Sequence, residues 1–362
     1  MLNPFFYPYS GGTEKHLLEV TKRLAKKHDV SILTAQIKGT KKKEEVNGVS
    51  IYRTNSWVLN DLPKPLPPPI PIMPFANSEL NALCKENDLV HIHNRFVYGL
   101  NETGIVKKNK KLLGITLHNA RPSGIDALTD FWGSAYDDTI GKTVMKRCDV
   151  ALAVSKSTMN DTLPKDYSGI RQVAYNGVDS IKFQPQKLAK KRQVICVARL
   201  MPQKGLGFLI KAIAKTDARL LMVGKGPEEK KLRLLAKQNG DKTQFITDKI
   251  SEEELARRYN ESSVFCLPSL WEPFGMALCE AMACETPSVA SAIGGIPEII
   301  DDGKNSLLAN PSDEIDLAEK INSLLADEKK ARRLGINGRK KVMKTFTWDN
   351  TAKAYEKAYA KL

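Results

Sequence analysis

The chain has 362 residues, of which 42% are hydrophobic, and a formal net charge of +15. Because a single core stops growing at roughly 250–300 residues, this length predicts two domains with well-filled cores. The charge favours anionic partners such as nucleotide sugars, phospholipid surfaces or nucleic acid, and it is uninformative about the fold. No apolar run reaches the roughly 18 residues of a membrane span, which excludes an integral membrane protein.

Short apolar runs alternate with helical periodicity in the first half of the chain, the pattern of a parallel sheet covered by helices. The predicted helices are Thr13–Lys27, Ser78–Glu86 and Ser155–Leu163, and the predicted strands are Val30–Leu33, Val49–Tyr52, Leu89–His93, Leu112–Leu117, Val150–Val154 and Gln172–Ala174. Between Pro63 and Pro71 proline rules out a helix and a central strand, so an extended loop or a lid is expected there. Two lysine clusters, at residues 41–43 and 107–111, are also expected on loops.

A second series of alternating strands and helices begins after Asp179. Its predicted helices include Leu206–Ala214 and Glu228–Gln238, and its predicted strands are Val194–Ala198, Arg219–Val223, Gln244–Ile246, Val264–Leu267, Ser288–Ala290 and Ser306–Leu308. We therefore predict an α/β fold of two Rossmann-like α/β/α domains, residues 1–180 and 181–345, with a closing helix at 346–362 that packs back on the first. A central cleft that both domains face is the natural ligand site.

Six cysteines are spread singly through apolar segments, without a CxxC motif or a paired spacing. Such cysteines are typical of reduced core residues, and they favour the cytosol. The sequence also lacks the pattern of a secretory leader. We therefore expect a cytoplasmic protein that is at most peripheral at the cytoplasmic face of a membrane.

The most informative segment runs from Trp271 to Ala283 and contains two glutamates eight residues apart. Glu272 falls on the loop after the predicted strand Val264–Leu267, on the side where α/β sheets bind ligands. If a helix begins near Phe274, Glu280 lies about two turns along it and points back toward the same opening. The pair could then hold the hydroxyl groups of a sugar and a ribose. The alternative is a helix cap and a solvated helical charge.

Basic or glycine-rich loops precede several other predicted helices. Arg199 and Lys204 lie on one strand-to-helix loop, where two cations and the helix dipole could clamp a diphosphate. Gly11-Gly12 could let backbone amides approach an anion, and Gly294-Gly295 could form a turn or a pocket wall. Gly224-Lys225-Gly226 lacks the ending of a P-loop, which argues against kinase or GTPase chemistry. Each glycine pair could equally be a simple tight turn.

Taken in order, these segments resemble the retaining GT-B glycosyltransferases of family four, also called glycosyl transferases group 1. The resemblance extends nearly from end to end, and the ordered set is highly specific although each element alone is weak. Its elements are Gly11-Gly12 with Glu14, Val90 to His93, Thr116 to His118, Asp149 to Ser155, Asn176 to Asp179 with Phe183, Ala198 to Leu200 with Lys204-Gly205, Gly224 to Pro227, Glu272 to Glu280, and Gly294-Gly295.

The resemblance implies transfer of a sugar from a nucleotide diphosphate sugar, such as a UDP- or GDP-sugar, to an acceptor with retention at the anomeric carbon. It implies no bound metal and no cofactor besides this donor. Arg199 and Lys204 would meet the negative charge of the leaving diphosphate. Glu272 would hold the sugar hydroxyls and Glu280 the ribose hydroxyls, neither of them as nucleophile or general base. The proton acceptor is not identified from the sequence, and the departing phosphate is one candidate.

The same resemblance implies further contacts with the donor. The residues expected to bind it are Gly12, Gly226, Ile250, Phe274, Gly275, Met276 and Glu280. His118 would reach the donor sugar from the first domain, although a lone histidine after a strand is commonly a capped or solvated residue. His91 and His93 alternate onto one face of a strand, but no third ligand is spaced nearby, so no metal site is predicted and His93 is placed at the cleft edge.

Three features depart from the family pattern. The family often has glycine about where Asp248 stands, close to the expected base contact at Ile250. It also usually has glycine at Glu285, where another residue costs around 1 kcal/mol if φ is positive. A buried first strand is expected before the Gly11-Gly12 loop, yet only Met1–Asn3 precede Pro4. Either the start lies several residues late, or the strand is shortened or missing and the loop loses its anchor.

Other function classes stay open from the sequence alone. On the same fold, a nucleotide-sugar epimerase would turn over its donor without an acceptor, whereas a phosphorylase would need a pyridoxal-phosphate lysine, for which no motif is present. The charge also allows a non-catalytic protein that binds an anionic surface or nucleic acid. Aromatic residues make up only 7% of the chain, which disfavours nucleic acid. The expected partners are a nucleotide sugar, a glycan, lipid-linked or small-molecule acceptor, and an anionic membrane surface.

Overall fold

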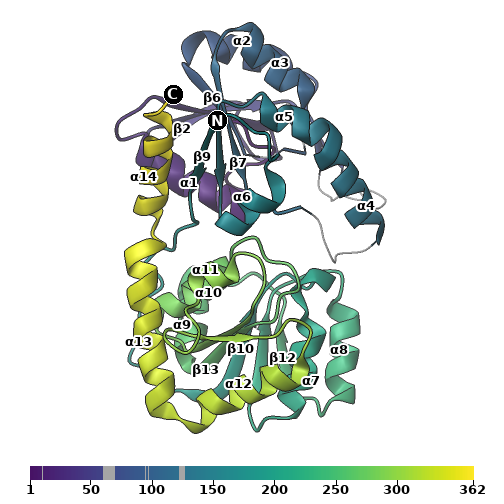
Figure 1. The fold of residues 1–362 in the computed structure, drawn as a ribbon, viewed down its shortest axis with the longest axis vertical. Coiled ribbons are helices and arrows are strands. Elements are labelled where there is room, and N and C mark those ends of the chain that lie inside the picture. The colour runs from purple at the N-terminus through teal and green to yellow at the C-terminus, as the bar shows by residue number, and fades with distance from the viewer. Residues whose placement is uncertain (10, 60–69, 94, 97, 122–126) are drawn as a thin grey trace. The chain divides into compact units, whose positions relative to one another are not determined.

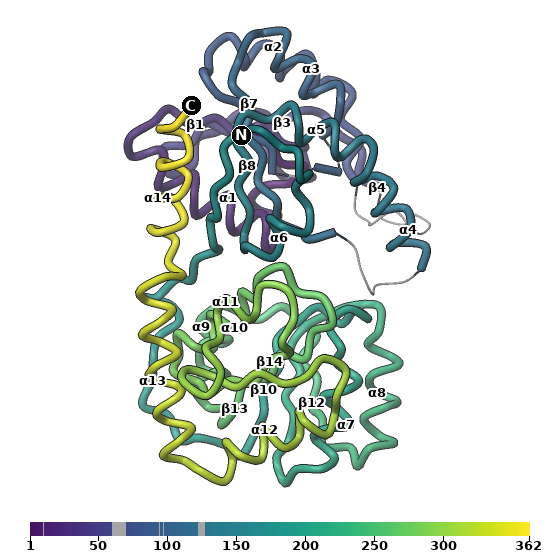
Figure 2. The backbone as a smooth tube through the Cα atoms, viewed as in Figure 1, coloured from purple at the N-terminus to yellow at the C-terminus, as the bar shows by residue number. Residues whose placement is uncertain are grey.

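The computed structural model describes residues 1–9, 11–59, 70–93, 95–96, 98–121 and 127–362. They form two compact units, which we call unit 1, Met1–Asn176 with Trp348–Leu362, and unit 2, Gly177–Thr347 (Figure 1). The chain passes into unit 2 once and returns to unit 1 with its last helix (Figure 2). The sequence predicted two domains, residues 1–180 and 181–345, and a closing helix at residues 346–362. The predicted loop from Pro63 to Pro71 lies outside the described residues except for its last two positions.

Unit 1 is built on parallel strands in two groups. The first group has the order β6 (Leu89–Ile92), β7 (Leu112–Leu117), β8 (Val150–Ala153), β9 (Ile170–Val173). In the second group β1 (Val30–Ala35) lies parallel to β3 (Val49–Thr54), and β2 (Lys43–Val46) is antiparallel at the edge. The sequence placed the start of β2 on a loop, which was wrong. Its charged residues alternate between exposed and half-buried positions, as edge strands do, and this composition hides it from a search for apolar runs.

The first three residues join these two groups of strands. Leu2 forms parallel bridges with Leu33 of β1 and with Ile92 of β6. The N–H of Leu2 donates to the carbonyl of His91 at 2.7 Å, and the N–H of His93 donates to the carbonyl of Leu2 at 2.9 Å. Leu2 is buried. The strand order is therefore β2-β3-β1-Leu2-β6-β7-β8-β9, in which the first strand is shortened to one bridging residue.

Helices and a small hairpin complete unit 1. Their bounds are α1 (Gly12–Leu24), α2 (Ala76–Glu86), α3 (Leu100–Lys108), α4 (Ala127–Tyr136), the π-helical turn η1 (Asp137–Gly141), α5 (Lys142–Lys146), α6 (Lys156–Thr162), α14 (Trp348–Tyr359), and the hairpin of β4 (Trp57–Leu59) with β5 (Ile70–Ile72). The last helix, α14, packs beside α1, and Tyr355 and Ala358 share a buried apolar cluster with Val20 and Leu24. Burial of this apolar face attaches the end of the chain to unit 1.

Unit 2 has one parallel sheet in the order β12-β11-β10-β13-β14-β15. The strands are β10 (Lys191–Val197), β11 (Arg219–Val223), β12 (Thr243–Ile246), β13 (Ser262–Leu267), β14 (Ser288–Ser291) and β15 (Leu307–Ala309). The helical segments are η2 (Pro202–Lys204), α7 (Leu206–Ala214), α8 (Glu229–Gln238), α9 (Glu252–Glu261), α10 (Met276–Ala283), α11 (Ile296–Ile299), α12 (Glu314–Ala326) and α13 (Glu328–Thr345). All the strands predicted for this half are present, in the order of a Rossmann sheet.

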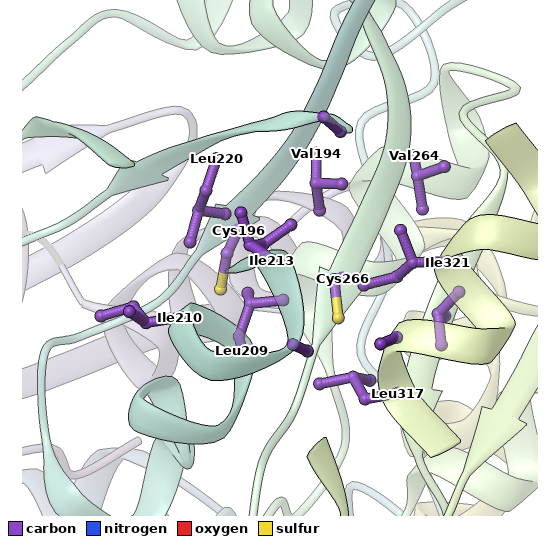
Figure 3. Packing of buried hydrophobic residues seen from close by; sticks show 14 of the residues in the cluster. Val194, Cys196, Leu209, Ile210, Ile213, Leu220, Val264, Cys266, Leu317 and Ile321 are labelled. Carbon is purple, nitrogen blue, oxygen red and sulfur yellow. The ribbon is translucent and has the colours of Figure 1, made fainter. Parts of the chain in front are cut away.

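One large core cluster of unit 2 lies between this sheet and the helices α7, α8, α12 and α13, and Figure 3 shows part of it. Val194 of β10 and Cys266 of β13 pack with Leu209 of α7 and Ile321 of α12, and all four are fully buried. The strands β10 and β13 each contain a run of consecutive apolar residues, which is typical of parallel strands covered on both faces. All six cysteines are free and buried, as the sequence predicted. Among the described residues, no helix combines the length and the apolar composition that crossing a membrane requires.

Glu285 follows α10 in the left-handed conformation, with a φ of 57°. Its N–H donates to the carbonyl of Met282 at 3.0 Å, and the N–H of Thr286 donates to the carbonyl of Ala281 at 3.0 Å. These two bonds form a Schellman motif, which requires a left-handed residue at this position. From the sequence, a cost of around 1 kcal/mol was expected if φ is positive, and the structure shows that φ is positive at Glu285.

Candidate functional site

The candidate site of unit 2 lies at the carboxyl ends of β10 and β13. These strands are neighbours in the sheet. From β10 the chain continues to β11 and β12 on one side, and from β13 it continues to β14 and β15 on the other. In open α/β sheets, ligands bind at the carboxyl ends of the strands where the order reverses in this way. Arg199 and Lys204 follow β10, and Glu272 follows β13.

Backbone contacts hold these two loops against each other. The N–H of Leu270, after β13, donates to the carbonyl of Gln203 in η2 at 2.9 Å. Gly205 has a φ of 60°, and a Cβ at this position would lie 2.2 Å from the carbonyl oxygen of Pro268. Only glycine allows both the conformation and the close approach. These contacts therefore fix the backbones of the two loops relative to each other.

Lys204 and Glu272 form an ion pair across these loops. The distance from Lys204 Nζ to Glu272 Oε2 is 2.7 Å, and the side chains are only 13% and 11% exposed. The hydroxyl of Ser269 donates to the same carboxylate oxygen at 3.2 Å. The N-cap of α10 is Gly275, so the alternative that Glu272 caps this helix is wrong. Because water is largely excluded, the attraction between the two charges is stronger than at an open surface.

The glycine pair after β14 supports the backbone of Glu272. The N–H of Gly295 donates to the carbonyl of Glu272 at 3.0 Å. Gly294 has a φ of 55°, and a Cβ there would lie 2.1 Å from the same carbonyl oxygen. A Cβ on Gly295 would lie 2.4 Å from the carbonyl oxygen of Pro273. The sequence left open whether these glycines form a turn or a pocket wall, and the structure shows them supporting the loop that contains Glu272.

The start of α10 is anchored by an aromatic side chain. Phe274 is 2% exposed, and its ring centre lies 5.6 Å from that of Phe346. Gly275 follows with a φ of 116° as the N-cap, without a side-chain cap, and Met276 is the first helical residue. The sequence placed this start near Phe274, which is confirmed to within two residues. The amides of an uncapped first turn can donate to an anion, which the helix dipole also favours.

Glu280 lies on the second turn of α10 and is 9% exposed. The hydroxyl of Tyr259 in α9 donates to its Oε2 at 3.3 Å. Burial, together with this carboxylate, raises the pKa of Tyr259 well above its usual value, so the phenol keeps its proton. The alternative that Glu280 is a solvated surface charge is wrong. An ionised carboxylate can accept several hydrogen bonds, so it can accept from Tyr259 and from ligand hydroxyls together.

Arg199 and the expected base contacts lie on adjoining loops of the same sheet edge. The side chain of Arg199 is exposed, and within the described part of the chain no carboxylate pairs with it. The N–H of Leu200 donates to the carbonyl of Lys225 at 3.0 Å, and a Cβ on Gly226 would lie 2.3 Å from the carbonyl oxygen of Leu200. Ile250 is half-buried on the loop after β12. The nucleobase contact at Gly226 and Ile250 stays a prediction.

Unit 1 contains the two other residues that the sequence analysis assigned to the donor, Gly12 and His118. Gly12 is exposed and is the first residue of α1. His118 follows β7 and is half-buried, and its Nε2 lies 3.1 Å from Nδ1 of His93. Burial lowers the pKa of His118 well below its usual value, so the ring is neutral at pH 7. A neutral imidazole can both donate and accept hydrogen bonds, as contact with a sugar hydroxyl requires.

The sequence did not predict the side chains that contact Glu280 and Glu272. Tyr259 and Ser269 have no local pattern that marks them, because their roles depend on the packing of α9 and of the loop after β13. The proximity of His16 to His93 and His118 was also missed, since the three residues lie on α1, after β6 and after β7. Sequence spacing alone gives no signal for a cluster assembled from three separate segments.

Two family descriptions match the chain in adjoining segments, "Glycosyltransferase Family 4" over residues 10–181 and "Glycosyl transferases group 1" over residues 178–341. An uncharacterised glycosyltransferase of Methanocaldococcus jannaschii is 30% identical over 100% of this chain and 98% of its own length. The alpha-maltose-1-phosphate synthase of Mycolicibacterium smegmatis is 25% identical over 97% and 96% of the two chains. HepE of Anabaena, solved in complex with UDP, matches with a TM-score of 0.79 at 18% identity, over 100% and 99% of the chains. This last likeness shows the fold, which is GT-B.

Proposed function

Since the chain belongs to the family 4, group 1 glycosyltransferases and is thus an enzyme of the transferase class, we propose that it moves a sugar from a nucleotide diphosphate sugar to an acceptor with retention of the anomeric configuration. The observation behind this proposal is the ion pair of Lys204 with Glu272 at the point where the strand order reverses. It places a cation that suits a diphosphate beside a carboxylate that suits sugar hydroxyls.

Donor binding would exchange this ion pair for two separate contacts. In the protein alone, the charges of Lys204 and Glu272 neutralise each other. The diphosphate would take Lys204 together with the exposed Arg199, and Glu272 would accept hydrogen bonds from the sugar. Each of the two buried charges then keeps a partner. A buried charge without a partner would destabilise the protein. Opposite charges held 2.7 Å apart thereby prepare the site for a ligand with a phosphate end and a hydroxylated end.

The same groups would lower the barrier for departure of the diphosphate. Negative charge grows on the leaving phosphate, and fixed cations and amide dipoles that point at it stabilise the transition state. Arg199, Lys204 and the amides of residues 274–276 would supply them. Glu272 would orient the anomeric carbon and oppose its positive charge. A departing phosphate oxygen would take the proton of the acceptor hydroxyl, which attacks from the face that the phosphate leaves.

The remaining predicted residues would position the donor. We assign Glu280 to the ribose hydroxyls, because it is buried with one oxygen on Tyr259. Gly226 and Ile250 would lie against the base, His118 would contact the sugar through its neutral ring, and Gly12 would present its amide. Each assignment is a proposal that single substitutions test.

A thermal-shift panel of UDP-, GDP- and ADP-sugars tests the donor site. One donor class is expected to raise the melting temperature selectively, because a ligand at 100 times its Kd adds about 2.7 kcal/mol of stability. Lys204→Ala is expected to abolish this shift. Lys42→Ala, a lysine that is exposed on unit 1, is the matched control and is expected to keep it. Absence of a shift with every nucleotide sugar would rule out the proposal.

Product analysis separates this function from that of an epimerase. A transferase consumes the donor only when an acceptor is present, apart from slow hydrolysis, and the coupling of the anomeric proton in the product shows retention. Turnover of the donor into another nucleotide sugar without an acceptor would identify an epimerase. An inverted product would contradict the retaining mechanism.

We further propose a lipid-linked acceptor at the cytoplasmic face of an anionic membrane. The support is the charge of +15 and the exposed Leu128, Phe131 and Trp132 on α4, a helix without a buried residue. Exposed aromatic side chains favour the membrane interface, and a net positive charge favours anionic lipids. The protein is expected to float with phosphatidylglycerol vesicles, and Phe131→Ser with Trp132→Ser to reduce this at least about threefold. Leu234→Ser on α8, also exposed, is the control, and failure of the wild-type protein to float would contradict the proposal.

A further inference from the structure

Four of the five histidines of the chain come together in unit 1. Ring nitrogens of His16, His93 and His118 all lie within 4.8 Å of one another. The ring centre of His118 is 4.7 Å from that of His16 and 5.4 Å from that of His93. His91 adjoins this group, with its ring centre 5.0 Å from that of His93. The fifth, His28, is exposed after α1, so it offers a matched control.

We propose that His16, His93 and His118 bind one transition-metal dication of the zinc class. Three imidazole nitrogens suit Zn²⁺, Co²⁺, Ni²⁺ or Cu²⁺, whereas Mg²⁺ and Ca²⁺ require oxygen ligands. With Zn–N bonds of about 2.1 Å, tetrahedral ligands lie about 3.4 Å apart. His93 Nδ1 and His118 Nε2 are already 3.1 Å apart, and the His16 nitrogen, which lies within 4.8 Å of both, has to approach them to reach this spacing.

The hydrogen bonds of His93 leave its Nδ1 unprotonated, as metal binding requires. Its Nε2 lies 3.1 Å from the sulfur of Met1. A thioether can only accept, so Nε2 carries the proton and Nδ1 is unprotonated. Nδ1 therefore accepts from Nε2 of His118. A metal ion would replace that bridging proton, which moves to the other nitrogen of the His118 ring, so both residues become ligands without net loss of a proton.

The hydrogen bonds of His16 leave its Nε2 unprotonated, with a lone pair for a metal ion. Its Nδ1 lies 2.6 Å from the amide oxygen of Asn176 and donates to it, so Nε2 is the unprotonated nitrogen. The hydroxyl of Tyr355 lies 2.8 Å from this Nε2 and donates to it. Tyr355 is itself 2.6 Å from the hydroxyl of Thr116, which can donate in turn. Metal binding would displace Tyr355, while Asn176 keeps the orientation of the ring, as outer partners of metal ligands do.

Metal binding would inhibit the transferase, a consequence that rests on the proposed function. A bound ion takes the Nε2 of His118, the residue assigned to the donor sugar, and fixes its ring against His93 and His16. Metal binding itself does not depend on that assignment. The two can therefore fail separately, because binding is measured without donor or acceptor.

Titration of the full chain with Co²⁺ and Zn²⁺ tests the site. One Co²⁺ per chain is expected to give the intense visible absorption of a four-coordinate nitrogen site, and Zn²⁺ is expected to displace it. His118→Gln and His16→Gln are expected to weaken binding at least about 100-fold, and His28→Gln to leave it unchanged. Equal binding by His118→Gln and the wild type, or an equal loss with His28→Gln, would overturn the proposal, as would no bound ion in the wild type.

Two measurements remain decisive if a histidine variant fails to fold. The zinc K-edge absorption spectrum of the wild-type complex is expected to show three imidazole ligands, and a shell dominated by sulfur would overturn the proposal. Tyr355→Phe removes the hydroxyl that competes for His16, so it is expected to tighten Zn²⁺ binding by about fivefold, one typical net hydrogen bond. Weaker binding by this variant would place the ion elsewhere. Inhibition of sugar transfer by Zn²⁺ is then measured separately, and its absence would overturn only the inhibitory consequence.

Discussion

Glu272→Gln is expected to lower kcat/KM for sugar transfer by about 10²–10³-fold, the range for loss of one electrostatic contact in a transition state. The amide keeps the size of the side chain but cannot oppose the positive charge that develops at the anomeric carbon. Steady-state kinetics with the donor that the thermal-shift panel identifies measure the loss. An activity within threefold of the wild type would contradict the role assigned to Glu272.

The same substitution is expected to tighten binding of the free nucleoside diphosphate. Lys204 is only 13% exposed and loses its partner in the variant, which costs about 3 kcal/mol of stability for a buried charge left unpaired. A diphosphate then restores the missing negative charge without displacing a carboxylate. Isothermal titration calorimetry is expected to show a lower Kd for the nucleoside diphosphate, although turnover of the nucleotide sugar falls.

The expected decrease in kcat/KM together with tighter binding of the nucleoside diphosphate distinguishes a functional role of Glu272 from a structural one. If Glu272 only stabilised the loop, its replacement would weaken binding of the diphosphate as well. Glu229→Gln is the matched control, because Glu229 also forms an ion pair in unit 2, with Arg233 at 2.9 Å, but at the surface of α8. Such surface pairs contribute about 0–1 kcal/mol, so neither kinetics nor binding is expected to change.

The sequence predicted the sheet of unit 2 well because its strands are short apolar runs between helices of regular period. Glu272 and Lys204 could be assigned to the same sheet edge, since each follows a predicted strand. Their direct contact could not be predicted, because it depends on the hydrogen bond from Leu270 to Gln203, which pairs two loops far apart in sequence. The role of Gly294 was likewise hidden, since a glycine pair before a helix is also an ordinary turn.

Unit 1 was predicted less completely. The strand β2 consists of Lys, Glu, Glu and Val, and nothing in that composition distinguishes an edge strand from a charged loop. The single bridging residue Leu2 is too short to give a periodic signal. The proximity of His16 and His118 to His93 was not predicted, because these two histidines come from α1 and from the end of β7. Long-range packing therefore determines the histidine cluster, and sequence separation conceals it.

Gly294→Ala is expected to reduce kcat/KM by at least about 10²-fold, the effect of a displacement of about 1 Å at a reacting group. The added Cβ would lie 2.1 Å from the carbonyl oxygen of Glu272, so one of the two backbones must move. The hydrogen bond from Gly295 to that carbonyl would be stretched or lost, and the carboxylate would leave its position beside Lys204. The free energy of unfolding is expected to fall by more than about 3 kcal/mol, since overpacking adds to the strain of a positive φ.

Gly303→Ala separates the effect of this collision from that of the backbone conformation. Gly303 has a φ of 69°, close to the 55° of Gly294, but no atom lies within 4 Å of an added Cβ. Its substitution therefore carries the conformational cost of about 1 kcal/mol without a collision. Urea unfolding is expected to show the smaller loss for Gly303→Ala, and kinetics to show unchanged transfer. Equal activities of the two variants would mean that the support given by Gly294 to Glu272 is unimportant for donor turnover, and that the site tolerates a displaced carboxylate.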